Sequence, residues 1–391
     1  TLETGTSDAV VDFASGSATN VLTFTYTVGA GHTSSDLDYA STTALALNGG
    51  TVKDAVGNNA TLTLAAVGDT GSLGANEAFV IDTTAPTISS VTSTTADGTY
   101  KEGDSVDVIV TFSEAVTLAG GNLVVTLETG ETDRTVTIAT INSATTASGT
   151  YAVQAGDTSS DLTVSGIALS AGTLTDGGGN TMSSFAIATN LAASSALVID
   201  TTAPTVTGVD SSTDPGTYKQ GDQISIQVTF SEAVTVTGTP RLTLETGTSD
   251  AVVDFASGSA TNVLTFTYTV GAGHTSSDLD YASTTALALN GGTVKDAVGN
   301  NATLTLAAVG DTGSLGANEA FVIDTTAPTV TGVDSSTDPG TYKQGDQISI
   351  QVTFSEAVTV TGTPRLTLET GTSDAVVDFA SGSATNVLTF T

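Results

Sequence analysis

The chain has 391 residues and is strongly acidic, with 41 Asp and Glu side chains against 8 Lys and Arg and a formal net charge of −33. This balance argues against nucleic-acid binding, because phosphate contacts need Lys and Arg, and against docking on an anionic membrane. Cysteine is absent, which excludes disulfides, thiolate metal sites and a cysteine nucleophile. No apolar stretch approaches the ~20 residues of a membrane-spanning helix, so direct membrane insertion is not expected.

The sequence repeats itself with a fixed period. Residues 199–267 recur without change as residues 323–391, and residues 1–87 recur as residues 243–329. Repetition of this kind is typical of an array of domains, and units of this size can each bury a core. We expect the chain to be a segment of a longer array. Its parts are the back of a repeat (1–84), a diverged repeat (85–202), a whole repeat (203–326) and the front of a repeat (327–391).

Alternation of apolar and polar residues predicts strands. It is clearest from Ile224 to Phe230 and from Leu264 to Val270, where it indicates half-buried strands. Turn residues separate such runs, and at most a short helical turn is expected around 276–281. Seven or more short strands per repeat predict an all-β fold of Ig-like antiparallel β-sandwich domains, arranged end to end as a rod. Further strands are predicted at 205–209, 241–244, 252–255, 286–289, 303–306 and 320–323.

Three motifs recur in a fixed order: Asp-Thr-Thr-Ala-Pro-Thr at 82–87, Thr-Phe-Ser-Glu-Ala-Val at 111–116 and Asp-Ala-Val-Gly-Asn at 296–300. In this order they resemble the tandem bacterial Ig-like repeats of giant bacterial surface proteins and adhesins, of the swimming-motility and RTX-adhesin type. The resemblance implies a secreted, cell-surface extender that is often stiffened by calcium between domains. The diverged repeat departs from the pattern, because residues 176–180 read Asp-Gly-Gly-Gly-Asn.

Oxygen-bearing side chains are expected to meet where one repeat follows another. In an Ig-like sandwich the linker, the loop after the second strand and the F–G turn lie at the entry pole, and the E–F turn lies at the exit pole. Calcium takes six to eight oxygen ligands, so these positions predict a structural Ca²⁺ site at each junction. The expected ligands are Asp82, Glu114, Asp176, Asn180 and Asp36 at the first junction, Asp200, Glu232, Asp296, Asn300 and Asp161 at the second, and Asp324, Glu356 and Asp278 at the third.

Each of these residues also has a simpler interpretation. An Asp that opens a turn commonly accepts backbone hydrogen bonds, as Asp296 would. Asp200 can simply end a strand, and Glu232 can be a solvated charge in the loop after a strand. The acidic surface as a whole can serve solubility and repulsion between neighbouring chains. Both interpretations stay open on the sequence alone.

No catalytic constellation is found, so an enzyme is not expected. The two histidines, His32 and His274, occupy the same repeat position, where the diverged repeat has Asp157, and are interpreted as surface loop residues. The favoured function is a structural spacer that projects or links binding domains away from the cell. Its partners would be the neighbouring repeats, with lateral self-association into filaments. The alternative is that the repeats are themselves adhesive and bind glycan, a host surface or one another.

Overall fold

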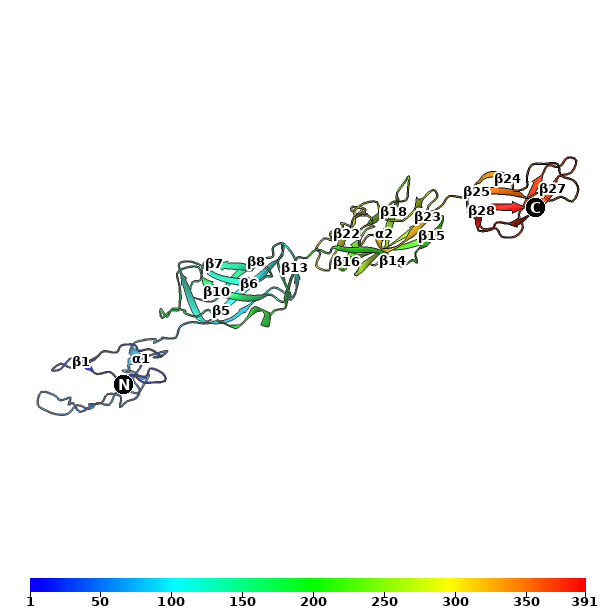
Figure 1. Cartoon of the computed structure of the whole chain (residues 1–391). Coiled ribbons are helices and arrows are strands. Elements are labelled where there is room, and N and C mark those ends of the chain that lie inside the picture. Colours follow the sequence, from blue (N-terminus) through cyan, green and yellow to red (C-terminus); the bar gives the residue numbers. More distant parts are fainter. The chain divides into compact units, whose positions relative to one another are not determined.

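The computed structural model describes residues 1–391, and its elements are labelled along the chain in Figure 1. About 42% of the residues lie in strands and 3% in helices, which confirms the predicted all-β class. None of the helices is long and apolar enough to cross a lipid bilayer.

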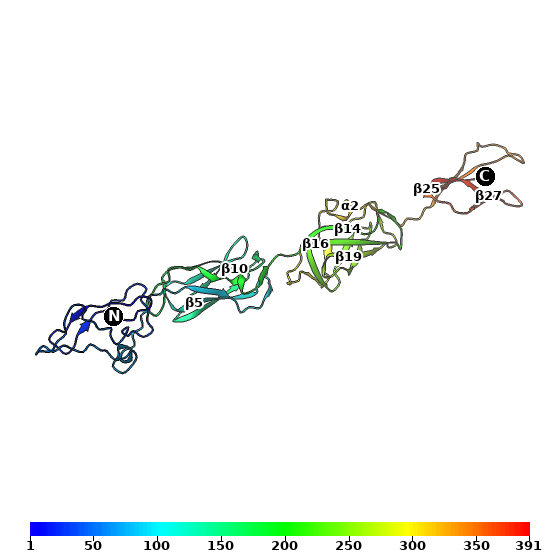
Figure 2. The same cartoon turned by 90° about the horizontal axis from the view of Figure 1, so that it is seen from below.

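The diverged repeat, residues 85–202, folds into sheets that enclose one core, and its strands β5 and β10 can be followed in Figure 1 and Figure 2. The largest sheet holds β3 (Ile88–Thr92), β5 (Ser105–Ala119), β8 (Ala144–Ala152), β11 (Thr173–Thr175) and β12 (Ile187–Thr189). A second sheet holds β6 (Leu123–Glu128), β7 (Arg134–Ile138) and β10 (Thr163–Leu169). A third holds β4 (Gly98–Tyr100), β9 (Thr158–Ser159) and β13 (Leu197–Asp200), and a 3₁₀ turn covers Leu191–Ala193.

The core of this repeat follows the period-two pattern of its strands. Val106, Val108 and Val110 of β5 are fully buried, while Asp107 between them is only partly so. They pack with the buried side chains of β6, including Leu127, in one continuous cluster. Removal of this apolar surface from water, worth about 25 cal/mol per Å², is the main driving force for closing the sheets on one another.

The long strand β5 changes partner along its length. Its first half pairs with β8, its register shifts between Thr111 and Val116, and its last residues pair with β11. Such a bulge bends a strand and lets it pass from one neighbour to the next. Glu114 lies at this bend, and Glu232 lies at the equivalent bend of β16 (Gln223–Thr237). The expectation that these two residues lie in a loop after a strand is therefore wrong, because the strand continues through the bulge.

The whole repeat, residues 203–326, has the same plan around a core of its own. Its main sheet contains β14 (Val206–Ser211), β16, β17 (Arg241–Leu244), β18 (Ala251–Ser257), β19 (Thr261–Thr269), β21 (Leu287–Ala288) and β22 (Thr293–Lys295). A small sheet holds β15 (Gly216–Tyr218), β20 (Thr275–Ser276) and β23 (Phe321–Asp324). In this small sheet the last strand closes the repeat by pairing in parallel with β15, with Gly216 opposite Phe321.

One sequence prediction fails locally in this repeat. Residues 303–306 do not form a strand, because their backbone makes only an isolated bridge, between Thr205 and Thr303. The apolar pattern of this segment reflects packing against the core, where Leu306 is buried. Residues 276–281, where the sequence allows at most a short helical turn, form no helix. The short helix is instead α2 (Leu315–Asn318), which begins where the Ser314 side chain accepts a hydrogen bond from the Ala317 amide.

The two partial repeats differ in how much core they retain. Residues 1–84 contain β1 (Phe13–Ser15), β2 (Thr23–Phe24) and α1 (Leu73–Asn76), and Phe24 is exposed where its repeat equivalent Phe266 is buried, because this segment lacks counterparts of β14 and β16. Residues 327–391 form a five-stranded sheet with a small core around Val352 and Phe390. Its strands are β24 (Val330–Ser335), β25 (Ile350–Val358), β26 (Arg365–Leu368), β27 (Ala375–Ser381) and β28 (Thr385–Phe390).

Candidate cation site

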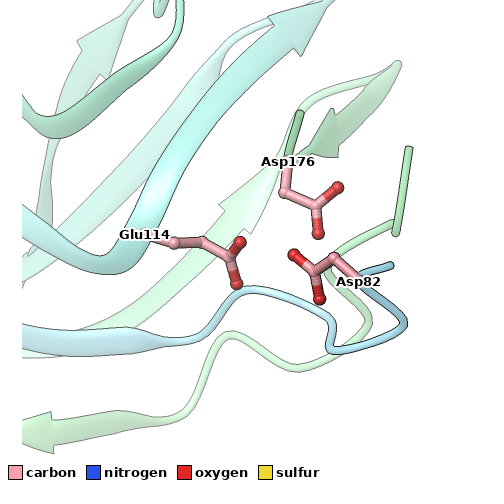
Figure 3. A group of neighbouring side chains, drawn as sticks. All are labelled: Asp82, Glu114 and Asp176. Carbon is pink, nitrogen blue, oxygen red and sulfur yellow. The ribbon is translucent and has the colours of Figure 1, made fainter. Parts of the chain in front are cut away.

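Three carboxylates from distant parts of the sequence converge near the bend of β5. Asp82 comes from the linker before the diverged repeat, Glu114 from β5 and Asp176 from the turn after β11. One oxygen of each lies within 4.8 Å of one oxygen of each other residue, and Figure 3 shows the three carboxyl groups directed toward one another. Asp82 and Glu114 are partly buried and Asp176 is buried. The fold thus gathers three negative charges in a partly desolvated space.

The side chain of Asp176 also stabilises the turn in which it lies. The Asp176 Oδ1 atom accepts a hydrogen bond from the Asn180 amide at 2.8 Å, and Oδ2 accepts one from the Asn180 side-chain amide at 2.8 Å. Asp54 and Asn58 of the first partial repeat make the same two bonds, at 2.8 and 2.7 Å. The turn-forming interpretation of this Asp is therefore correct as far as it goes, and it leaves the carboxylate in a fixed orientation.

Asn180 positions the group through its nitrogen. Its side-chain amide also donates to the backbone carbonyl of Asp82 at 3.1 Å, so one side chain ties the linker to the turn of Asp176. Gly178 lies against the same atoms: a Cβ at this position would be 3.2 Å from Asn180 Nδ2 and 3.4 Å from both Asp176 Oδ1 and the Asp82 carbonyl oxygen. We expected Asn180 as a cation ligand, and the structure shows it as a hydrogen-bond donor that orients two of the expected ligands.

The electrostatics of the site are unfavourable for three bare carboxylates. Burial raises the pKa of Glu114 above its usual value, and the neighbouring charges of Asp82 and Asp176 raise it further. None of the ion pairs in the structure includes any of these three residues. Asp82 has one local partner, the Thr84 amide, which donates to Oδ1 at 2.9 Å. A cation with oxygen ligands would offset this mutual repulsion.

The other expected ligand of this junction lies elsewhere. Asp36 is exposed and is not one of the three converging carboxylates. Its Oδ2 atom lies 3.3 Å from the position that a Cβ on Gly74 would occupy, and Asp38 Oδ2 lies 3.2 Å from that position. Asp36 therefore faces the start of α1 together with Asp38.

The equivalent residues of the later repeats are placed by their own elements. Asp200 ends β13 and accepts from the Thr202 amide at 2.9 Å, and Asp296 is 5% exposed in the turn after β22. Asn300 donates its side-chain amide to the Asp200 carbonyl at 3.0 Å, as Asn180 does to that of Asp82. Asp324 ends β23 and accepts from the Thr326 amide at 2.9 Å. Glu356 lies within β25, and Asp161 and Asp278 are exposed.

Sequence reasoning missed a second kind of acidic residue, the buried Asp38 and its repeat equivalent Asp280. Asp280 accepts from the Tyr281 amide at 2.8 Å and from the Gly310 amide at 3.1 Å. Asp38 accepts the matching bonds, and although burial alone would raise its pKa, the hydrogen bonds from Tyr39, Gly68, Ser72 and Gly74 outweigh this and lower it. The signal was the pattern Leu-Asp-Tyr, in which the Asp stands between two core residues.

The histidine position is also more than a surface loop. Asp157, which stands there in the diverged repeat, is 1% exposed and accepts from Arg134 Nε at 2.7 Å, Tyr151 Oη at 2.6 Å and the Gln154 amide at 2.9 Å. His274 is partly buried and its Nδ1 atom lies 2.8 Å from Tyr268 Oη. His32 and His274 do lie in loops, as expected, but they are partly buried, and each contacts a tyrosine that reaches out from the core.

Comparison with known proteins adds no family to these observations. No protein-family model matches this chain, and no curated protein is similar to it in sequence.

Proposed function

We propose that this chain is a structural spacer of a secreted bacterial surface protein, built from Ig-like sandwiches in tandem, and that it carries no catalytic role. The observation that carries the proposal is the unchanged repetition of a unit that encloses its own core. A unit of this kind can be duplicated without redesign, because its stability depends on its own buried side chains. Length then increases with each copy, which suits a spacer and adds nothing to a single catalytic site.

We further propose that the group of Asp82, Glu114 and Asp176 binds Ca²⁺. Each of the three carboxylates brings one oxygen within 4.8 Å of the others, so they would supply three of the six to eight oxygen ligands that calcium takes, and hard oxygen ligands suit this ion. The bound charge would offset the repulsion that raises the pKa of Glu114. Because Asp82 lies in the linker and the other two lie in the repeat, the ion would fix the linker on the sandwich that follows it.

The spacer proposal predicts that length follows the number of repeats. Deleting residues 203–326 joins two identical linker sequences, so the remaining repeats should fold unchanged. The 15-residue strand β16 sets the scale of one repeat, about 50 Å at ~3.3 Å per residue. Small-angle scattering in calcium should show a maximum dimension shorter by roughly 40–50 Å. An unchanged maximum dimension would refute the spacer proposal. If the full chain bound glycan or cells, and a single repeat bound them equally well, the adhesive alternative would be favoured.

The calcium proposal predicts that the substitution Glu114→Gln raises or leaves the Tm of the diverged repeat in EDTA but lowers it in calcium. Met182 is the only methionine and lies in the core of the diverged repeat, so its methyl resonance reports the melting of this repeat within the full chain. Calcium at a hundred times its dissociation constant should add about 2.7 kcal/mol. For a repeat of this size that is a rise in Tm of roughly 11 °C.

The variant Glu114→Gln separates a cation ligand from a mere repulsive charge. With EDTA it should melt at or above the wild type, because a raised folded pKa means that ionised Glu114 destabilises the folded state at neutral pH. With calcium it should lose most of the rise, because one ligand is gone. Asp133→Asn, an exposed acid of the same repeat, is the control and should keep the full rise. Equal melting of the wild type with calcium and with EDTA would overturn the site.

A further inference from the structure

The ring of His274 accepts a hydrogen bond from a backbone group. The Gly271 N–H donates to Nδ1 at 3.1 Å, and a backbone amide can only donate, so Nδ1 must be the unprotonated nitrogen. The Tyr268 hydroxyl lies 2.8 Å from the same atom, and the two rings stack with centroids 5.9 Å apart. His32 has the same contacts, with the Gly29 amide at 3.1 Å and Tyr26 Oη at 2.7 Å.

The same loop holds the linker that leaves the repeat. The His274 carbonyl accepts a hydrogen bond from Thr325 Oγ1 at 2.9 Å. In the first partial repeat Thr83 Oγ1 donates to the His32 carbonyl at 3.0 Å and accepts from the Gly31 amide at 3.1 Å. Each of these threonines is the first of the two that follow the pair Ile-Asp, which recurs in every linker of this chain, so the histidine loop anchors the start of the linker.

The diverged repeat keeps this anchor and changes the side chain. Thr201 Oγ1 donates to the Asp157 carbonyl at 2.9 Å and accepts from the Gly156 amide at 3.1 Å. The Asp157 side chain takes its donors from Arg134, Tyr151 and the Gln154 amide. The repeats with histidine at the position of Asp157 have alanine, Ala9 or Ala251, at the position of Arg134. The exchange is therefore coupled: histidine goes with alanine, and aspartate goes with arginine.

The charged groups on the elements around His274 are engaged in other contacts. Asp324 on β23 accepts from the Thr326 amide, and Glu245 accepts from the Gly247 amide. In the turn before β16, Lys219 and Asp222 pair with each other at 3.0 Å. The ionisable group in contact with the imidazole is the Tyr268 phenol, whose pKa burial raises to about 12, so it stays neutral across the physiological range.

We propose that the histidine loops are pH-sensitive latches on the linkers that follow them, and that the aspartate loop of the diverged repeat is their pH-insensitive counterpart. Histidine is the side chain whose charge changes between about pH 5 and 8. Protonation places a hydrogen on Nδ1, which the Tyr268 hydroxyl can accept but the Gly271 N–H cannot, so the bond from the backbone to the ring is lost. The loop loosens, and with it the bond from Thr325 to the His274 carbonyl. Asp157 stays charged in this range, and its three donors remain.

Hydrogen exchange of the full chain tests this with an internal control. Exchange is measured by mass spectrometry at about pH 7.5 and about pH 5 in EDTA, and rates are corrected for the intrinsic pH dependence. Residues 29–34 and 271–276 have the same sequence, so their peptides report together. Their protection should fall by roughly two- to tenfold at the lower pH, the scale of one lost hydrogen bond. Protection of residues 154–158 should hold. An equal response of the two kinds of loop would overturn the latch.

Exchanging the side chains gives the decisive comparison. A variant with Asp157→His and Arg134→Ala should make residues 154–158 respond to pH as the histidine loops do. A variant with His32→Asp, His274→Asp, Ala9→Arg and Ala251→Arg should abolish the response of residues 29–34 and 271–276. The two exchanges go in opposite directions, so a loss of folding in one leaves the other to decide. A pH response that stays with the original loops after either exchange would refute the proposal.

Discussion

Asp157 offers the most direct test of how the diverged repeat is held together. Its two carboxylate oxygens receive three donors: Arg134 on Oδ1, and Tyr151 and the Gln154 amide on Oδ2. Burial alone would raise the pKa of Asp157, but these bonds outweigh it and lower the pKa. The substitution Asp157→Asn keeps the shape and replaces one acceptor with an NH₂ donor. Whichever way the amide is turned, a donor then faces a donor.

The magnitude follows from what is left unpaired. A buried donor without an acceptor costs about 1–3 kcal/mol, and breaking a buried ion pair costs about 3–5 kcal/mol. The Arg134 side chain is 25% exposed, so water recovers part of its solvation and the lower end applies. We therefore expect a loss of about 3 kcal/mol in the free energy of unfolding. At about 2.1 cal/mol/K of unfolding entropy per residue, a repeat of ~120 residues should melt roughly 12 °C lower.

The assay is the thermal loss of the native Met182 methyl resonance in the full chain, which follows the diverged repeat alone. Asp133→Asn removes the same charge one residue before Arg134, on the surface, and should change Tm by no more than about 2 °C. A Tm for Asp157→Asn that matches this control would refute the account of Asp157 as an acceptor that the repeat requires.

Three further predictions use the same resonance. Because the pKa of Asp157 is lowered in the fold, ionised Asp157 stabilises the folded state above the unfolded pKa of about 3.9, and this stabilisation is lost as pH falls through the folded pKa. Asp157→Asn should therefore flatten the fall of Tm below about pH 4. Leu127→Ala empties a fully buried position and should cost about 2.5–5 kcal/mol by urea unfolding, whereas a loss under 1 kcal/mol would mean that the core refills. Gly172→Ala should lower the free energy of unfolding more than Gly156→Ala. Both glycines have positive φ, but only at Gly172 would the added Cβ meet a backbone oxygen, at 2.2 Å. Equal losses for the two variants would contradict the clash.

The sequence predicts the sheets of this protein better than it predicts where strands end. Alternation from Ile224 to Phe230 locates the first half of β16, since burial of every second residue leaves a clear pattern. The pattern breaks at Ser231 and Glu232, which was interpreted as a loop, and the strand in fact continues through a bulge to Thr237. A bulge changes the period of side chains without ending the hydrogen bonds of the backbone, so alternation alone cannot tell it from a strand end.

For the candidate site, the repeated motifs predict which residues lie at the linker but not which atoms face one another. Asp82, Glu114 and Asp176 do converge. Asn180 turns its nitrogen toward them, because its hydrogen bonds to Asp176 and to the Asp82 carbonyl fix it, and Asp36 faces α1. Sequence spacing encodes neither orientation. Whether calcium occupies the site stays a prediction.

The parallel pairing of β15 with β23 has a consequence for how these repeats are made. Gly216 meets Phe321 near the opposite end of the repeat, so the small sheet cannot form until almost the whole unit has left the ribosome. Until then the chain holds an unfinished sandwich beside stretches of identical sequence, since residues 203–267 recur as 327–391. Misassembly between like domains is a characteristic hazard of repeat proteins. The diverged repeat keeps the same Gly-Thr-Tyr at β4, but its strands β7 and β8 differ in sequence from the equivalent strands β18 and β19. At these two strands its neighbours therefore offer it fewer false partners during synthesis.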